Sequence, residues 1–219
     1  MGGRFGDGPV RPEPPKVDLG TAWEARALAL VLAAGAARLW TIDESRHARE
    51  SLAPADYARF GYYEKWLAGM ADLLAAKGIV GADELARGHA ATVAERPLPQ
   101  ALPGPGVAKV LASGGPSLRD GGPAPAFATG DRVVTRRPAA NTAVAGGHTR
   151  LPSYAAGATG TVLRCHGNHV LPDHSAHGLG ECPEPLYAVA FDAAELWGAA
   201  EGAGDEVILD LWQSYLAPA

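Results

Sequence analysis

The sequence predicts an α+β protein in which a helical N-terminal part precedes a small β-barrel. Apolar residues recur every three to four positions before about residue 95, a period typical of amphipathic helices. After residue 127 they alternate, as in strands. Between these patterns lies a Pro- and Gly-rich stretch, residues 96–126, which predicts a linker because so long an aperiodic stretch is unusual inside one compact domain.

Four helices are expected in the N-terminal part. The first two each begin with a capping box, in which a Thr is followed three residues later by a Glu. The second of them carries Arg46. The expected helices begin at Thr21, at Thr41, at Tyr62 and at Asp83, and the last two end at Lys77 and at about Glu95. Within the linker, a short helix is expected around Val107 to Ala112.

The C-terminal part has four strand candidates separated by glycine-containing turns, which indicates a small β-barrel. They are residues 131–135, 160–163, 187–191 and 207–212. Residues 1–20 are rich in Gly and Pro, and we expect an extended arm that is either disordered or ordered only on a partner. The predicted organisation is an arm (1–20), a helical domain (21–95), a linker (96–126) and a barrel domain (127–219).

Composition excludes several classes of function. The net charge of −5 and the pI of about 5.8 give no electrostatic basis for binding nucleic acid. The longest strongly apolar run, Ala27 to Ala37, has eleven residues. A membrane span needs roughly 18. The first residues form no apolar signal core, so the expected location is the cytoplasm.

A cluster of potential metal ligands lies near the C-terminus. Cys and His are the ligands that zinc prefers, but structural zinc sites usually contain paired Cys-x₂₋₄-Cys motifs, and none occurs here. The sequence favours the alternative of a polar hairpin loop with solvated histidines and a buried Cys182. The cluster comprises Cys165, His166, His169, His174, His177 and Cys182. Phosphate-binding loops, dinucleotide fingerprints and nucleophile elbows are also absent from the sequence.

The stretch from Gly178 to Tyr187, Gly-Leu-Gly-Glu-Cys-Pro-Glu-Pro-Leu-Tyr, resembles the C-terminal domain of the nitrile hydratase β subunit. The resemblance covers nearly the whole chain, and it is the order and spacing of short motifs that make it specific. The other motifs are Trp23-Glu24, Asp43-Glu44, Pro54-Ala55-Asp56-Tyr57, Tyr62-Tyr63, Gly130-Asp131-Arg132-Val133-Val134, Gly147-His148-Thr149-Arg150, Gly160-Thr161-Val162, Pro172-Asp173, and Trp212 with Tyr215.

The resemblance implies a partner. Members of this family form an αβ heterodimer, often an α2β2 tetramer, and the β subunit has an arm, a helical domain and an SH3-like barrel. The α subunit holds Co(III) or Fe(III) through cysteine sulfurs and backbone amides, and two of those cysteines are oxidised to sulfenic and sulfinic acid. This chain lacks the α subunit's Cys-x-x-Cys-Ser-Cys motif, so it is expected to bind no metal itself.

Two arginines are expected to be functional by resemblance. Arg46 and Arg150 match the positions whose guanidinium groups compensate the anionic oxygens of the oxidised cysteines. Arginine suits this task because it stays charged and offers forked donors to paired oxygens.

Four further residues are expected at the substrate pocket by resemblance. Tyr62 and Trp66 lie one helical turn apart and therefore share a face. The Tyr62 hydroxyl is expected in the hydrogen-bond network of the pocket. Ile42 is expected to line the pocket, and His148 to orient the loop that carries Arg150.

The implied reaction is the hydration of a small nitrile to an amide. The metal acts as a Lewis acid on the nitrile nitrogen, and a water or a sulfenate oxygen attacks the nitrile carbon. Three alternatives stay open at this point: a subunit of a thiocyanate hydrolase-type enzyme, a non-catalytic metallochaperone or activator for the α subunit, and a free-standing zinc-binding module.

Overall fold

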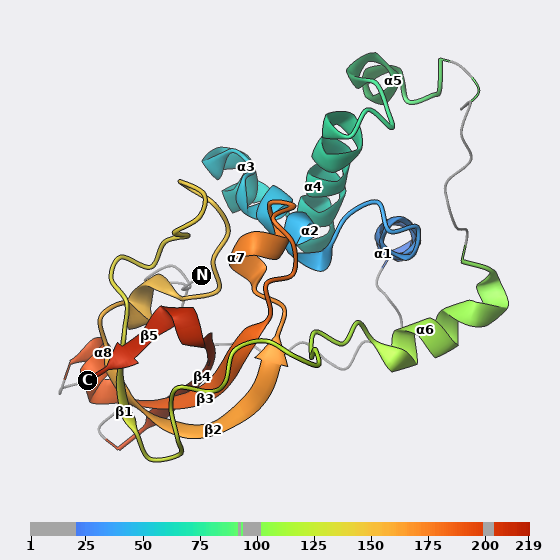
Figure 1. The fold of residues 1–219 in the computed structure, drawn as a ribbon. Helices are drawn as coiled ribbons and strands as arrows, with labels where there is room; N and C mark the ends of the chain where they lie inside the picture. The colour runs from blue at the N-terminus through green and yellow to red at the C-terminus, as the bar shows by residue number, and fades with distance from the viewer. Residues whose placement is uncertain (1–20, 92, 94–101, 199–203) are drawn as a thin grey trace. The chain divides into compact units, whose positions relative to one another are not determined.

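The structure is a computed structural model. It describes residues 21–91, 93, 102–198 and 204–219. The predicted arm, residues 1–20, lies outside the described residues. The chain divides into two compact units, one up to Val110 and one from Leu111 onward. The first contains helices and the second an antiparallel sheet, so the predicted combination of an N-terminal helical region and a C-terminal β region is confirmed (Figure 1).

Carboxylates cap the starts of the helices in the N-terminal unit. The backbone N–H of Thr21 donates to Glu24, and that of Thr41 donates to Glu44, each at 2.6 Å, which confirms both capping boxes. Two further glutamates, Glu64 and Glu84, accept in the same way from the glycines that precede α4 and α5. The helices of this part are α1 (Ala22–Ala36), α2 (Ile42–Glu50), α3 (Pro54–Arg59), α4 (Tyr62–Ala76), α5 (Ala82–Arg87), the 3₁₀ turn η1 (Gly104–Gly106) and α6 (Val107–Ser113).

Two helices differ from the prediction. The helix expected from Asp83 to about Glu95 begins at Ala82 but ends at Arg87, because Gly88 adopts a left-handed conformation with φ of 71° and terminates it. Helix α3 was not predicted, although Pro54 at its first position is a recognised start signal. The short helix expected within 107–112 is present as α6.

Helices α2 and α4 pack closely and run antiparallel. Gly69 on α4 faces α2, where an added Cβ would lie 2.9 Å from the Arg49 Cγ and 3.2 Å from the Arg49 backbone nitrogen. The absence of a side chain at Gly69 therefore sets the short distance between the two helices. Lys77, just after α4, forms a 2.8 Å ion pair with Glu44 in the first turn of α2.

The C-terminal unit is built on a five-stranded antiparallel sheet with the order β4-β3-β2-β1-β5. Strand β2 is long and strongly curved (Figure 1), and its pairing with β3 shifts register at two places, between Val162 and Arg164 and between Cys165 and Asn168. In the described part of the chain β4 and β5 pair on one side only, so the sheet is open. The strands are β1 (Arg132–Thr135), β2 (Thr159–His169), β3 (Glu184–Asp192), β4 (Glu206–Trp212) and β5 (Leu216–Pro218).

The core of this unit is formed mainly by side chains of the strands and of the turn before β5. Tyr187, Phe191, Leu211 and Tyr215 are completely buried. Short helical elements connect the strands: η2 (Ser153–Ala155), α7 (Pro172–Ser175), α8 (Ala193–Trp197) and η3 (Gln213–Tyr215). None of the helices in the described part of the chain combines the length and the apolarity needed to cross a membrane.

Substituting Gly160 tests the packing of this core. A Cβ at Gly160 on β2 would lie 2.7 Å from Val189 Cγ1 and 2.8 Å from the Ala190 carbonyl oxygen. We expect Gly160→Ala to lower the free energy of unfolding by about 2 kcal/mol, the usual cost of overpacking a tight core. Gly115, where an added Cβ would have no neighbour within 4 Å, is the matched control, and Gly115→Ala is expected to change nothing in urea unfolding. Equal stability of both variants would contradict this account.

Candidate functional site

Arg46 lies in the middle of α2 and is held by its own helix. Its Nη1 donates to Asp43 Oδ1 at 2.8 Å, one turn earlier, and the Asp43 side chain is only 5% exposed against 33% for Arg46. A buried carboxylate thus restrains a guanidinium that is still partly open to solvent. The described geometry leaves Arg46 able to bind a further anionic group on its exposed side.

The aromatic pair predicted on α4 forms one cluster. The Tyr62 and Trp66 ring centroids lie 5.3 Å apart, and Tyr63 contacts both rings. The guanidinium of Arg49, from α2, stacks on Trp66 at 4.7 Å from its ring centroid. Burial between the helices lowers the pKa of the Arg49 guanidinium.

Two predicted pocket residues on the helical unit are unusually exposed for their type. Tyr62 is 66% exposed and Ile42, the first residue of α2, is 65% exposed. The structure therefore places Ile42, Arg46, Tyr62 and Trp66 on two adjacent helices of one unit. Arg150 and His148 lie in the C-terminal unit.

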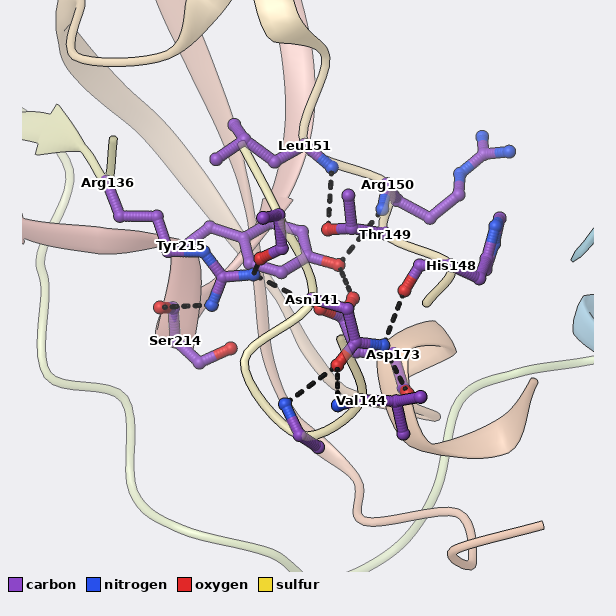
Figure 2. Close-up of polar contacts among 12 residues, drawn as sticks. Arg136, Asn141, Val144, His148, Thr149, Arg150, Leu151, Asp173, Ser214 and Tyr215 are labelled. Atoms are coloured by element: carbon purple, nitrogen blue, oxygen red, sulfur yellow. Dashed lines mark hydrogen bonds and ion pairs between the residues drawn. The ribbon is translucent and has the colours of Figure 1, made fainter. Parts of the chain in front are cut away.

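Arg150 lies in the loop between β1 and β2, and its backbone is fixed while its side chain is exposed. Its amide donates to the Tyr215 hydroxyl oxygen at 3.2 Å. Figure 2 shows the guanidinium pointing away from the buried polar network beneath the loop. No partner for it is found among the residues that the structure describes, so the group is available to a ligand.

The polar network beneath this loop converges on Asp173, at the start of α7 (Figure 2). The Tyr215 hydroxyl donates to the Asp173 carboxylate. The Asn141 amide donates to the carbonyl oxygens of His148 at 2.7 Å and of Asp173 at 2.8 Å. Two backbone carbonyls and one carboxylate oxygen are thereby satisfied inside a buried region, where leaving them unpaired would be costly.

Arg136 closes the network on the side of β1. Its Nη2 lies 3.1 Å from the other oxygen of Asp173, and its guanidinium stacks over the Tyr215 ring at 4.6 Å. The Arg136 amide also donates to the Tyr215 carbonyl at 2.8 Å. Because Asp173 is almost completely buried, this cation compensates its charge.

His148 is buried and fixed through its backbone. Its N–H donates to the His177 Nε2 at 3.0 Å, and its carbonyl accepts from Asn141. Gly147 is required beside it, because a Cβ there would lie 2.6 Å from the same His177 nitrogen. His148 thus lies within the anchored segment two residues before Arg150.

The Tyr215 hydroxyl stays protonated well into the alkaline range. Burial raises its pKa, and the facing Asp173 carboxylate raises it further. The hydroxyl therefore donates its proton to Asp173, and its oxygen accepts from the Arg150 amide. The direction of both hydrogen bonds follows from this protonation state.

The raised pKa predicts a loss of stability at high pH. In the unfolded chain Tyr215 ionises near its usual pKa of about 10. The folded state keeps the proton to higher pH, so the stabilising contribution is complete below about pH 10 and falls as pH rises above it. In urea unfolding of the full chain between about pH 9 and 11, we expect a steeper decline for the wild type than for Tyr215→Phe. Parallel declines would contradict the assignment.

The Cys- and His-rich stretch differs from the expected hairpin in two respects. Its histidines were expected to be solvated, but His166, His169, His174 and His177 are all half-buried. Cys182 was expected to be buried but is exposed, because it adopts a positive φ of 38° in the turn before β3 and directs its sulfur to His174 Nδ1 at 3.0 Å. His166 instead pairs with Asp210 at 3.0 Å. Among the described residues, which include this whole stretch, no three His, Cys, Asp or Glu side chains are placed to hold a metal ion.

A hollow of about 550 Å³ lies beside the network in the C-terminal unit, between Arg136, Asp173, His174 and Cys182. None of the six predicted site residues lines it. The hollow is therefore separate from the predicted site residues.

Several residues of the site were not predicted. Asp43, Asp173 and Tyr215 occur in motifs that carry the family resemblance, but no role was assigned to them. The signals that could have found them are the polar Asp43 three residues before Arg46, and the motifs of the C-terminal half that contain Asp173 and Tyr215. Asn141 and Arg136 gave no such signal, because their contacts with Asp173 join positions 32 and 37 residues apart in sequence.

The chain is thus made of a helical unit and a β unit, and each contains one of the two predicted arginines. A family profile described as the N-terminal part of the nitrile hydratase beta subunit matches residues 1–112, and one described as its C-terminal part matches residues 116–218. The chain belongs to the nitrile hydratase β-subunit family.

Individual relatives match along the entire chain. A nitrile hydratase subunit beta of Pseudomonas putida is 38% identical over 223 residues, which cover 100% of this chain and 97% of that protein. The low-molecular weight cobalt-containing nitrile hydratase subunit beta of Rhodococcus rhodochrous is 36% identical over 229 residues, again 100% and 97%. Among solved structures, the recombinant apo-enzyme of the thiocyanate hydrolase of Thiobacillus thioparus matches 45% of this chain and 79% of its own, with 26% identity and a TM-score of 0.39.

Proposed function

We propose that this chain is the β subunit of a nitrile hydratase and that, assembled with an α subunit, it completes a site in which a nitrile is hydrated to an amide. The observation that carries the proposal is the family match across both units, together with relatives that align over the whole chain. This agreement includes the segments that contain Arg46 and Arg150.

The metal belongs to the partner in this proposal. Co(III) or Fe(III), held by the α subunit, supplies Lewis-acid activation of the nitrile. Two observations support this division. A similar chain is named as the β subunit of a cobalt-containing nitrile hydratase, and the described residues of this chain offer no cluster of metal ligands. The donor set of this chain fits a supporting role, because its functional candidates are cations and aromatic rings.

The proposed role of Arg46 and Arg150 is electrostatic. Oxidised cysteine ligands carry anionic oxygens, and these need cationic hydrogen-bond donors to persist in a closed site. Arg46 has an exposed side beyond its contact with Asp43, and Arg150 has an exposed guanidinium on a fixed backbone. Both can therefore donate to groups of another chain.

The proposed substrate pocket uses the helical unit. Tyr62, Trp66 and Ile42 would line it, with the Tyr62 hydroxyl as a hydrogen-bond donor, and His148 would orient the Arg150 loop from the other unit. The large exposure of Tyr62 and Ile42 supports this, because apolar side chains of this size are usually covered by a partner or a ligand when they cluster.

For the architecture we propose the organisation of the family. The open sheet would correspond to an SH3-like barrel, which the pairing of the first strand with the last and the curvature of β2 support. The proposed domain limits are those predicted from the sequence: an arm 1–20, a helical domain 21–95, a linker 96–126 and a barrel domain 127–219. The proposed assembly is αβ or α2β2, in the cytoplasm.

Co-expression tests the proposal. The chain is produced with an α-type subunit that contains Cys-x-x-Cys-Ser-Cys, the complex is purified, and amide formation from a small nitrile is measured with cobalt or iron in the medium. We expect a complex that contains metal and hydrates nitrile. A complex that takes up metal but forms no amide would overturn the catalytic role and favour a metallochaperone, and hydrolysis of thiocyanate alone would favour the related hydrolase.

A further inference from the structure

The segment that carries Arg150 is fastened at two points to one buried residue. The Arg150 amide binds the Tyr215 hydroxyl, which donates to the Asp173 side chain. Two residues earlier, the His148 carbonyl binds the Asn141 amide, which also donates to the Asp173 carbonyl. Tyr215 is completely buried, and Asp173 and Asn141 are 3% and 8% exposed.

We infer that Tyr215, Asn141 and Asp173 are positioning residues for the Arg150 guanidinium. The inference rests on the proposed function of Arg150 and adds the device that holds it. An exposed arginine side chain has several rotatable bonds, so a fixed backbone is needed to limit the region that the guanidinium can reach. Here two hydrogen bonds fix that backbone on both sides of Thr149 (Figure 2).

The electrostatics of the network favour a fixed arrangement over an adaptable one. Arg136 lies 3.1 Å from the Asp173 carboxylate, so this nearly buried group has a cationic partner. The raised pKa of Tyr215 keeps its hydroxyl as the donor to this carboxylate. The hydroxyl oxygen then accepts from the Arg150 amide, which holds the loop at this point.

A kinetic double-mutant cycle tests the inference in the assembled αβ complex. Tyr215→Phe removes the hydroxyl and keeps the ring. We expect it to lower kcat about tenfold with KM nearly unchanged, because misplacing a charged group by a fraction of an ångström weakens only the step it assists. In an Arg150→Lys background, where the forked donor is already lost, the same change is expected to lower kcat less than about twofold.

Tyr187→Phe is the matched control. Tyr187 is also completely buried in this unit, and its hydroxyl likewise accepts from a backbone amide, that of Ala126 at 3.0 Å, and donates to a side chain, Gln213 at 2.8 Å. Neither Ala126 nor Gln213 belongs to the loop between β1 and β2 that carries Arg150. We expect Tyr187→Phe to change kcat by the same small factor with and without Arg150→Lys.

A second variant keeps the test available if Tyr215→Phe does not assemble. Asn141→Asp retains the oxygen that accepts from the Ala143 and Val144 amides but removes the donation to His148 and Asp173. It is expected to show the same dependence on Arg150.

The outcomes separate the inference from the proposed function. A loss of kcat that is equal in both backgrounds, or no loss at all, would overturn the positioning role while leaving the function of Arg150 intact. Full activity of the Arg150→Lys complex would overturn the proposed role of Arg150 and the inference with it. Loss of coupling in the Arg150→Lys background, with an additive control, would establish both.

Discussion

Arg150→Lys is expected to lower kcat for nitrile hydration by about 100-fold in the assembled complex, the usual effect of removing one preorganised donor at a charged site. Lysine keeps the charge but replaces a forked, planar group with a single point of donation, so it cannot bind two oxygens side by side. Because the Arg150 side chain has no partner among the residues that the structure describes, folding and assembly should be unaffected. Steady-state kinetics and size-exclusion chromatography of the complex measure the two effects.

Arg164→Lys is the control for this substitution. Arg164 is also exposed, lies in the same unit on β2, and belongs to no part of the network around Asp173. Its replacement is expected to leave kcat within about twofold of the wild type. Comparable losses in the Arg150 and Arg164 variants would indicate a general effect of surface charge and would contradict a specific role.

The second large effect is expected for Arg46→Lys, with kcat again lowered about 100-fold. Lysine at this position can still reach Asp43, so the buried carboxylate keeps a cationic partner, and stability should fall by less than about 1 kcal/mol. The prediction therefore separates the loss of function from unfolding. Removing the charge with Arg46→Ala would instead leave Asp43 without its partner, and a loss of activity could not be interpreted as clearly.

Arg59 provides the comparison for Arg46. It also pairs with an aspartate three residues earlier on a helix, with Arg59 Nη2 to Asp56 Oδ1 at 2.8 Å, but its side chain is 68% exposed. Arg59→Lys is expected to leave kcat unchanged. The activity of each complex is normalised to its bound metal, so that a defect in metal loading is not counted as a defect in turnover.

Local signals in the sequence predicted much of the fold. The capping glutamates placed the starts of α1 and α2 correctly, since the residues involved are three apart and their bond forms within one turn. The alternation of apolar residues located the first four strands. The end of the helix after Asp83 was missed because one glycine with positive φ overrode a continuing pattern of helix-forming residues.

The site was less predictable because its supports are distant in sequence. The motifs pointed to Arg150 itself, but its anchoring depends on Tyr215, 65 positions later, and on Asp173. No periodic pattern records such a contact. The prediction for Cys182 was wrong for a related reason, since its exposure follows from the backbone of a tight turn, which the residue type does not reveal.

Tyr215 lies immediately before β5, so the placement of Arg150 depends on a strand at the edge of the sheet. Strand β5 has only three residues and is paired with β1 alone in the described structure. Loss of the few residue pairs between β5 and β1 would loosen Tyr215, whose hydroxyl binds the Arg150 amide. We therefore expect an extension or tag fused after Ala219 to slow turnover from a distance, without touching substrate or partner.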